Sequence, residues 1–279
     1  MQSRWFHTGG YDICYRVVPA AGEQTGRIFM IHGFISSSLY WEQLAGMFSR
    51  AGYLCAMFDL PGFGSSTREA AHVPAKPREE IAAELMELLA PGEPWIVAGH
   101  SMGGGVAVNM AVLYPEKVAS LLLYAPGSFA GGLGEGTPMR YLAEPAGAAL
   151  SILLAPLLFV EPLARLLFAL GNADLQYAKG YAINRVTVPL KLAGTVRSLM
   201  YMVQRAKTTD YAAAARLEIP ILVIWAEKEF VLTPGMARRM RAALPQAAAQ
   251  TMRGGHMFSE QYAAETFERS ITFLKENNR

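Results

Sequence analysis

The sequence predicts an α/β fold in which a mostly parallel β-sheet carries helices on both faces. Short runs rich in β-branched and aromatic residues alternate with segments of helical periodicity, which is typical of parallel sheets covered by helices. The chain has 279 residues, of which 52% are hydrophobic and 17% charged, so it is long enough to bury a large core. The low charge also excludes a disordered chain, because disorder requires high charge and few apolar residues.

Six segments are predicted to be core strands, because each is short, apolar and bounded by turn residues. They are residues 27–31, 53–58, 94–99, 118–124, 219–225 and, as a weak last strand, 247–252. A further strand-like run, YDICYRVV, contains Cys14, and the strand 53–58 contains Cys55. Two cysteines exclude a disulfide scaffold and a Cys-rich metal site, so both are expected to be buried, reduced thiols.

Five helices are predicted between and after these strands, because their apolar residues recur every three or four positions. They span about 41–51, 79–89, 102–114, 234–244 and 260–276. In the second of them, Ile81, Leu85, Leu88 and Leu89 share one side and are expected to face the sheet.

The segment 127–216 interrupts this alternation and contains no convincing strand. It begins with a Gly-rich loop, AGGLGEGTP, and is predicted to be a helical cap inserted into a core formed by residues 1–126 and 217–279. Residues 148–170 approach the ~20 apolar residues of a membrane span. Prolines and charges interrupt them, however, so two short amphipathic helices over an apolar pocket are expected instead. Peripheral membrane contact or a homodimer through the cap remains an alternative.

The net charge of the chain and its first residues indicate which partners and which cellular location to expect. The chain carries 25 Lys and Arg against 23 Asp and Glu, a net charge of +2, and has no run of five basic residues. This balance argues against a nucleic-acid-binding protein. The segment MQSRWFHTGGYD lacks the apolar stretch of a secretory signal, so a cytoplasmic enzyme is expected.

The segment Gly99–Gly103, GHSMG, matches the pattern G-x-S-x-G. The significance of this match depends on its context, and here a predicted strand lies directly before it and a predicted helix directly after it. A sharp strand-to-helix turn would lift the Ser101 hydroxyl above the sheet and point it at the positive end of the helix. The sequence therefore predicts that Ser101 is a catalytic nucleophile.

A serine hydroxyl needs a base at neutral pH, and the chain has five histidines. His256 lies in the loop RGGHMF between the last strand and the closing helix, where its ring can reach over the carboxyl edge of the sheet. His32 is predicted to hold its loop by hydrogen bonds, and His100 to point away from the nucleophile. His7 and His72 are predicted to lie at the surface. His256 is therefore the predicted base.

The base in turn needs an acid that fixes its tautomer and stabilises the imidazolium. The strand ILVIW is followed by AEKEFVLTP, in which two carboxylates, Glu227 and Glu229, compete for this role. From the residues alone either could be a solvated loop charge.

These motifs together resemble the α/β-hydrolase family, over about residues 1–126 and 217–279. The chain order of serine, acid and histidine is similar to that family's order. HGF at 32–34 resembles its oxyanion loop, and DLPGFGS at 59–65 resembles its strand-4 turn. The resemblance implies an eight-stranded, mostly parallel sheet.

The family's acid segment, usually written W-G-x-x-D-x-x-x-P, resembles WAEKEFVLTP. On that match Glu229 takes the acid position and Glu227 does not. The family's usual residue is Asp, so the extra methylene of Glu229 must be absorbed by a shifted loop or rotamer. The resemblance also implies an oxyanion hole made of the backbone N–H groups of Phe34 and Met102.

The resemblance implies a capped serine hydrolase that works through an acyl-enzyme, with no metal or organic cofactor. The apolar inserted segment adds the expectation that its substrates are small apolar or aromatic carboxylic esters. The same triad could instead cleave a C–C bond, a thioester or an amide. A catalytically silent ligand-binding or interaction module on this fold is the alternative from a different class.

Overall fold

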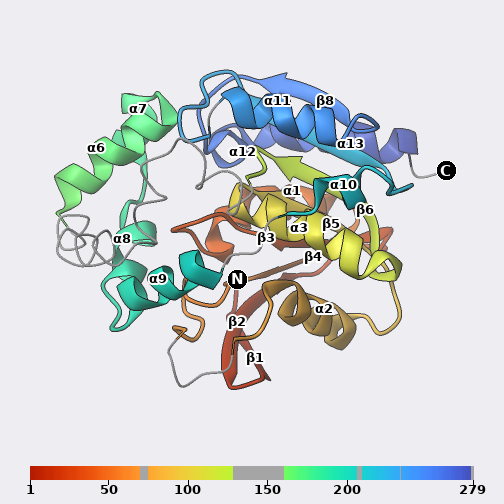
Figure 1. Cartoon of the computed structure of the whole chain (residues 1–279), viewed down its shortest axis with the longest axis horizontal. Helices are drawn as coiled ribbons and strands as arrows, with labels where there is room; N and C mark the ends of the chain where they lie inside the picture. Colours follow the sequence, from red (N-terminus) through yellow and green to blue (C-terminus); the bar gives the residue numbers. More distant parts are fainter. Residues whose placement is uncertain (70–74, 128–159, 206–208, 233, 278–279) are drawn as a thin grey trace.

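The computed structural model describes residues 1–69, 75–127, 160–205, 209–232 and 234–277. A central sheet of eight strands carries helices on both faces (Figure 1). The strands are β1 (Arg4–Thr8), β2 (Tyr11–Val18), β3 (Gly26–Ile31), β4 (Tyr53–Phe58), β5 (Trp95–His100), β6 (Val118–Tyr124), β7 (Ile221–Ala226) and β8 (Ala248–Met252).

The helices of the core pack in two layers. On one face α1 packs against α13 and β4, and on the other α3 packs against α2 and α10. The core helices are η1 (Ser38–Trp41), α1 (Glu42–Arg50), α2 (Arg78–Leu89), α3 (Met102–Leu113), η2 (Pro115–Lys117), α11 (Pro234–Ala243), α12 (Phe258–Gln261) and α13 (Ala263–Asn277). Between β6 and β7 lie α6 (Glu161–Asn172), α7 (Leu175–Gly180), α8 (Asn184–Leu190), α9 (Thr195–Arg205) and α10 (Tyr211–Ala214).

The strand order is β1-β2-β4-β3-β5-β6-β7-β8. The pairs β1–β2 and β2–β4 are antiparallel, and every other neighbouring pair is parallel. The carboxyl ends of β3 to β8 therefore meet at one edge of the sheet, where ligands bind in open α/β folds. The predicted α/β fold with an eight-stranded, mostly parallel sheet is confirmed, and all six predicted core strands are present within two residues of their predicted bounds.

The hairpin formed by β1 and β2 shows what the strand prediction missed. β1 is largely exposed, so it lacks the buried apolar run by which the core strands were recognised. Gly9 and Gly10 join the two strands, and both have positive φ angles, of 55° and 85°. Two glycines between β-rich runs are the usual signal of a tight hairpin turn, and this signal could have located β1.

Two details of the predicted helices are wrong. Leu88 is 54% exposed, while Ile81 and Leu85 are fully buried and Leu89 packs against the core, so Leu88 does not share the buried face of α2. The closing helix is divided into α12 and α13 at Tyr262, whose backbone leaves the helical region with φ −119° and ψ 49°. The cysteine prediction is confirmed, since Cys14 and Cys55 are both buried and free.

The described part of the segment between β6 and β7 is helical and contains no strand, as α6 to α10 show (Figure 1). The predicted Gly-rich loop and the first of the two predicted apolar helices lie outside the described residues. α6 matches the second, although Leu166, Leu167 and Leu170 are each close to half exposed or more. Among the described residues no helix is both long and apolar enough to cross a membrane.

Candidate active site

Ser101 occupies the turn between β5 and α3, in a backbone conformation that non-glycine residues rarely adopt. Its φ is +52° and its ψ −122°. Three hydrogen bonds hold this strained turn: Ser101 N–H donates to the carbonyl of Tyr124 at 3.0 Å, and the Ser101 carbonyl accepts from Gly104 at 2.9 Å and Gly127 at 2.8 Å. Backbone strain of this kind persists where surrounding contacts over-determine it, and it concentrates at functional sites.

Glycines on both sides of Ser101 allow a close approach that no side chain could share. A Cβ atom on Gly103 would lie 2.1 Å from the carbonyl oxygen of Ile31, and one on Gly99 would lie 2.4 Å from the carbonyl oxygen of Gly103. Real Cβ atoms do not approach so closely, so both positions require glycine. These contacts seat the start of α3 against the end of β3.

His256 and Glu229 form a hydrogen-bonded pair at the same edge of the sheet. His256 Nδ1 donates to Glu229 Oε2 at 2.8 Å, and the two side chains are 11% and 8% exposed. The other oxygen, Glu229 Oε1, accepts from the N–H groups of Val231 and Leu232 at 2.9 and 3.0 Å. Both oxygens of the carboxylate are therefore engaged, one with the imidazole and the other with the backbone of its own loop. This arrangement holds the imidazole ring of His256 in one orientation.

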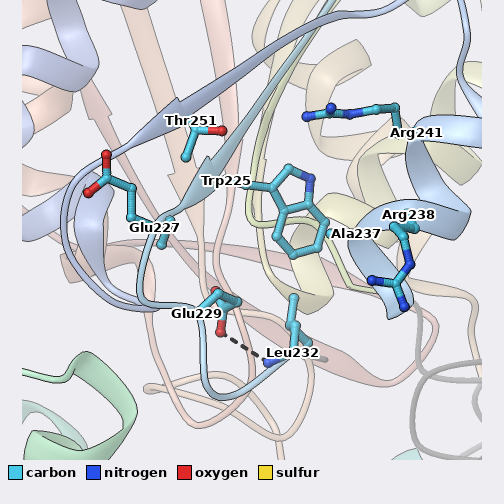
Figure 2. A pocket seen from close by; sticks show the side chains of 9 residues that line it. Trp225, Glu227, Glu229, Leu232, Ala237, Arg238, Arg241 and Thr251 are labelled. Carbon is cyan, nitrogen blue, oxygen red and sulfur yellow. Dashed lines mark hydrogen bonds between the residues drawn. The ribbon is translucent and has the colours of Figure 1, made fainter. Parts of the chain in front are cut away.

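Glu227 lies on the same loop but is exposed and has a different orientation. Figure 2 shows the side chains of Glu227 and Glu229 pointing in different directions. A pocket between β7, β8 and α11 touches both carboxylates, but neither Ser101 nor His256 lines it. The residues alone left these two carboxylates in competition, and the family resemblance selected Glu229; the structure pairs Glu229 with the histidine.

The loop that carries Glu229 also approaches the Ser101 turn. A Cβ atom on Gly127 would lie 3.4 Å from Leu232 Cδ2 and 3.7 Å from the carbonyl carbon of Ser101. On the other side of the turn, a Cβ atom on Gly33 would lie 3.0 Å from Ser101 Cβ. The loops after β3 and β6 therefore contact the Ser101 turn after β5, and the loop after β7 contacts the loop after β6. Phe34 follows Gly33, and Met102 is the first residue of α3.

His32 holds its loop as predicted. His32 Nδ1 donates to the carbonyl of Gly33 at 2.7 Å, and its Nε2 accepts from the N–H of Leu60 at 3.0 Å. Complete burial lowers the pKa of His32, against the opposing charge of Asp59, which fits a neutral ring that donates once and accepts once. His32 thus joins the loop after β3 to the turn after β4. His7 is exposed as predicted, and His72 lies outside the described residues.

His100 and Asn172 hold the loop of His256, and neither was predicted to do so. His100 Nε2 donates to the carbonyl of His256 at 2.9 Å, while its ring stacks on Tyr40 at 4.6 Å. Asn172, at the end of α6, accepts from the N–H of Met257 at 2.8 Å. His100 was visible in the elbow motif, but its partner was not. Asn172 lies in a segment with no motif, so no sequence signal marked it.

A second buried cluster surrounds Glu260 on α12, where the core meets α7 and α8. Tyr177 Oη donates to Glu260 Oε2 at 3.4 Å, and Arg185 Nη1 lies 3.7 Å from Glu260 Oε1. Arg185 also pairs with Glu42 at 2.8 Å. Burial raises the pKa of Glu260 to about 7, against the lowering effects of Arg185 and of hydrogen bonds from Tyr181 and Tyr177.

Comparison of the whole chain with known protein families agrees with this fold and with these residues. The chain belongs to the alpha/beta hydrolase family, whose sequence model matches residues 28–269. The resemblance drawn from the motifs is therefore confirmed, and the chain is a member of a family of hydrolases.

Among characterised relatives, a dihydrolipoyllysine-residue acetyltransferase component of the acetoin cleaving system of Pseudomonas putida is 26% identical over 98% of this chain and 67% of its own length. The monoacylglycerol lipase ABHD6 of Rattus norvegicus is 23% identical over 98% of this chain and 82% of its own. The crystal structure of an enol-lactonase from Burkholderia xenovorans LB400 superposes with a TM-score of 0.77 at 15% identity, covering 98% of this chain and all of the other. At that identity the structural match supports the fold alone.

Proposed function

We propose that this protein is a serine hydrolase that cleaves small apolar or aromatic carboxylic esters through an acyl-enzyme. The observation that carries the proposal is the buried hydrogen bond from His256 Nδ1 to Glu229 Oε2, at the edge of the sheet where the strained Ser101 turn lies. A carboxylate on Nδ1 keeps the proton on that nitrogen and leaves Nε2 free to accept another.

In the proposed mechanism His256 takes the proton of the Ser101 hydroxyl through Nε2, and the serine oxygen attacks the ester carbonyl carbon. Glu229 stabilises the imidazolium that forms. His256 then gives the proton to the leaving alcohol, and the acyl group stays on Ser101. His256 then takes a proton from a water molecule, whose oxygen attacks the acyl carbon. The bond to the Ser101 oxygen breaks, His256 returns the proton to that oxygen, and the carboxylic acid is released.

The negative oxygen of each tetrahedral intermediate is assigned to the backbone N–H groups of Met102 and Phe34. The position of Met102 at the start of α3 supports this, because the first N–H groups of a helix have no partner within the helix and carry its positive end. Each such donor is worth about 3–4 kcal/mol in the transition state.

The substrate class rests on the apolar composition of the inserted segment and on one relative. Residues 127–216 are proposed to form a cap over Ser101, with an apolar acyl pocket beneath it. The ABHD6 relative is named as a monoacylglycerol lipase, and a monoacylglycerol is an ester with an apolar acyl chain. Esters of this kind are therefore the first substrates to test.

The proposal is tested with a fluorophosphonate probe and a series of p-nitrophenyl esters. The parent is expected to become labelled at Ser101 and to turn over the esters. Ser101→Ala should abolish labelling and lower kcat by on the order of 10⁴–10⁶, with little change in folding. A folded Ser101→Ala variant that retains more than a tenth of the parent's ester turnover would refute Ser101 as the nucleophile.

The same experiment separates the alternatives. Labelling of Ser101 without ester turnover would direct the search to thioesters, amides and C–C bonds that the same triad could cleave. Absence of both labelling and turnover would favour a ligand-binding or interaction module.

A further inference from the structure

We propose that Asn172, in the last turn of α6, is a positioning residue for His256. It holds the backbone of the histidine loop so that the imidazole faces Glu229, and it makes the seating of α6 a condition for activity. The inference rests on the proposed function insofar as it assigns His256 as the base, and it deepens it by naming what controls that base.

The histidine loop is held from two sides. From the core, His100 Nε2 donates to the carbonyl of His256 at 2.9 Å. From the inserted segment, the carbonyl of Gly171 accepts from His256 N–H at 3.3 Å, and Asn172 Oδ1 accepts from Met257 N–H at 2.8 Å. Two consecutive N–H groups of the loop thus depend on acceptors that the end of α6 supplies.

The side chain of Asn172 is fixed for this task. It is 3% exposed, and its Nδ2 donates to the carbonyl of Phe168 one turn earlier in α6, at 2.8 Å. Because the amide donor is engaged there, the amide oxygen is directed at Met257 N–H. The side chain therefore transmits the position of α6 to the histidine loop.

The contact is closer than side chains normally permit. A Cβ atom on Gly255 would lie 2.3 Å from the backbone carbon and oxygen of Asn172, so only glycine allows the two backbones to meet. A Cβ atom on Gly171 would lie 3.4 Å from Val231 Cγ2, in the loop of Glu229. The end of α6 thus touches both the loop that carries the base and the loop that carries the acid.

A second tether follows directly along the chain. Gln261 Nε2, on α12, donates to Asp174 Oδ2 at 2.7 Å, and Asp174 Oδ1 accepts from the N–H groups that begin α7. The junction between α6 and α7 is therefore attached both to the histidine loop, at His256 and Met257, and to α12, at Gln261.

A displacement of α6 would cost free energy at two backbone N–H groups of the histidine loop. Moving α6 away leaves the N–H groups of His256 and Met257 without these acceptors, and a buried N–H without a partner costs about 1–3 kcal/mol. The loop would relax to satisfy them, and a displacement of about 1 Å at a catalytic group can lower the rate by 10²-fold. The position of α6 and the position of the imidazole are therefore coupled.

The test compares Asn172→Ala with a matched control, Asn109→Ala. Asn109 Nδ2, on α3, donates to Glu79 Oε1 at 2.9 Å, so the control loses one asparagine hydrogen bond away from the histidine loop, where Asn172→Ala loses two. A third variant, Asn172→Asp, keeps an acceptor oxygen for Met257. Each is measured by Tm, by kcat and KM on an ester that the parent hydrolyses, and by the far-downfield NMR resonance of the proton between His256 and Glu229.

We expect Asn172→Ala to lower kcat by about tenfold or more, to leave KM within about threefold, and to broaden or remove the resonance. Asn109→Ala should leave kcat and the resonance near the parent's values. Asn172→Asp should fall between Asn172→Ala and the parent in both, because it keeps an acceptor for Met257 N–H but loses the donor to the Phe168 carbonyl. In a Glu229→Gln background the effect of Asn172→Ala on kcat should shrink to below about twofold, because both act through one imidazole.

The inference is overturned if Asn172→Ala keeps the resonance and more than half of kcat. It is also overturned if Asn172→Ala fails to fold while Asn109→Ala folds, since Asn172 would then have a general structural role. A parent without the resonance would contradict the pairing of His256 with Glu229 and remove the basis of the inference. The resonance needs no substrate, so a parent that has it but is neither labelled nor active would refute the proposed function alone.

Discussion

Replacing Glu229 by glutamine exchanges one carboxylate oxygen for an NH₂ group, and the proposed mechanism predicts a large loss of activity. Both carboxylate oxygens are engaged: Oε2 accepts from His256 Nδ1, and Oε1 accepts from the N–H groups of Val231 and Leu232. A glutamine amide has one accepting oxygen and one NH₂ group that only donates. It therefore cannot satisfy both sets of donors.

The size of the loss in kcat follows from the two orientations that the glutamine amide can take. If the amide oxygen stays on the N–H groups of Val231 and Leu232, the NH₂ group faces His256 Nδ1. That nitrogen must then accept, which places the ring proton on Nε2, where it blocks proton transfer from Ser101. If the amide turns over, the correct tautomer returns, but two backbone donors lose their acceptor at about 1–3 kcal/mol each. A penalty of ~2–6 kcal/mol corresponds to a loss in kcat on the order of 10²–10⁴.

The assay is steady-state hydrolysis of a p-nitrophenyl ester, with folding checked by circular dichroism. Glu227→Gln is the matched control, since Glu227 is exposed on the same loop and should cost less than about tenfold. Glu229→Asp should fall between the parent and Glu229→Gln, because a shorter side chain reaches the backbone donors but not His256 at the same time. Near-parent turnover by folded Glu229→Gln, with loss of activity in Glu227→Gln, would contradict the assignment of Glu229 as the acid. If neither change matters, the triad itself is wrong.

Three further predictions follow from burial and from the proposed acyl pocket. Burial raises the pKa of Glu260 from 4.5 to about 7. Between these two pH values the folded protein keeps a proton that the unfolded chain has released, so the free energy of unfolding falls as the pH rises from 4.5 to 7. Glu260→Gln should therefore raise Tm relative to the parent above pH 7 and leave it unchanged near pH ~4; identical Tm–pH curves would contradict this. Cys14 and Cys55 are fully buried, and burial raises the pKa of both thiols, so a thiol reagent should label them only after denaturation; rapid labelling of the native protein would count against it. Each added methylene of the acyl chain should raise kcat/KM by roughly fourfold, from about 0.8 kcal/mol, until the pocket is full; a flat series from acetyl to hexanoyl esters would contradict an apolar pocket.

The order of elements along the chain was predictable because it depends on local patterns. Buried strands such as 53–58 and 118–124 were located to the residue, since a parallel strand covered on both faces must be apolar throughout. β1 was missed because it is an exposed edge strand. The break at Tyr262 was missed because the hydrophobic pattern of a helix continues across it.

The candidate catalytic residues also differ in how far the sequence alone could predict them. The turn that contains Ser101 was visible in the sequence, because a strained strand-to-helix turn needs small residues at fixed positions. The choice between Glu227 and Glu229 required the match to a family segment, since two carboxylates two residues apart have equal claims by composition. Their difference is one of direction, which only the path of the loop after β7 decides (Figure 2).

Local patterns were enough to predict the α/β fold, the Ser101 turn and the position of His256 after the last strand, because each depends on residues that are neighbours in the chain. The residues that hold the loop of this histidine were identified from the folded chain alone. His100 and Asn172 reach the backbone of its loop from two other segments of the chain, and no periodicity or spacing encodes a contact between residues 85 to 156 positions apart. Such contacts arise when parallel strands bring their carboxyl ends to one edge and the loops beyond them pack together.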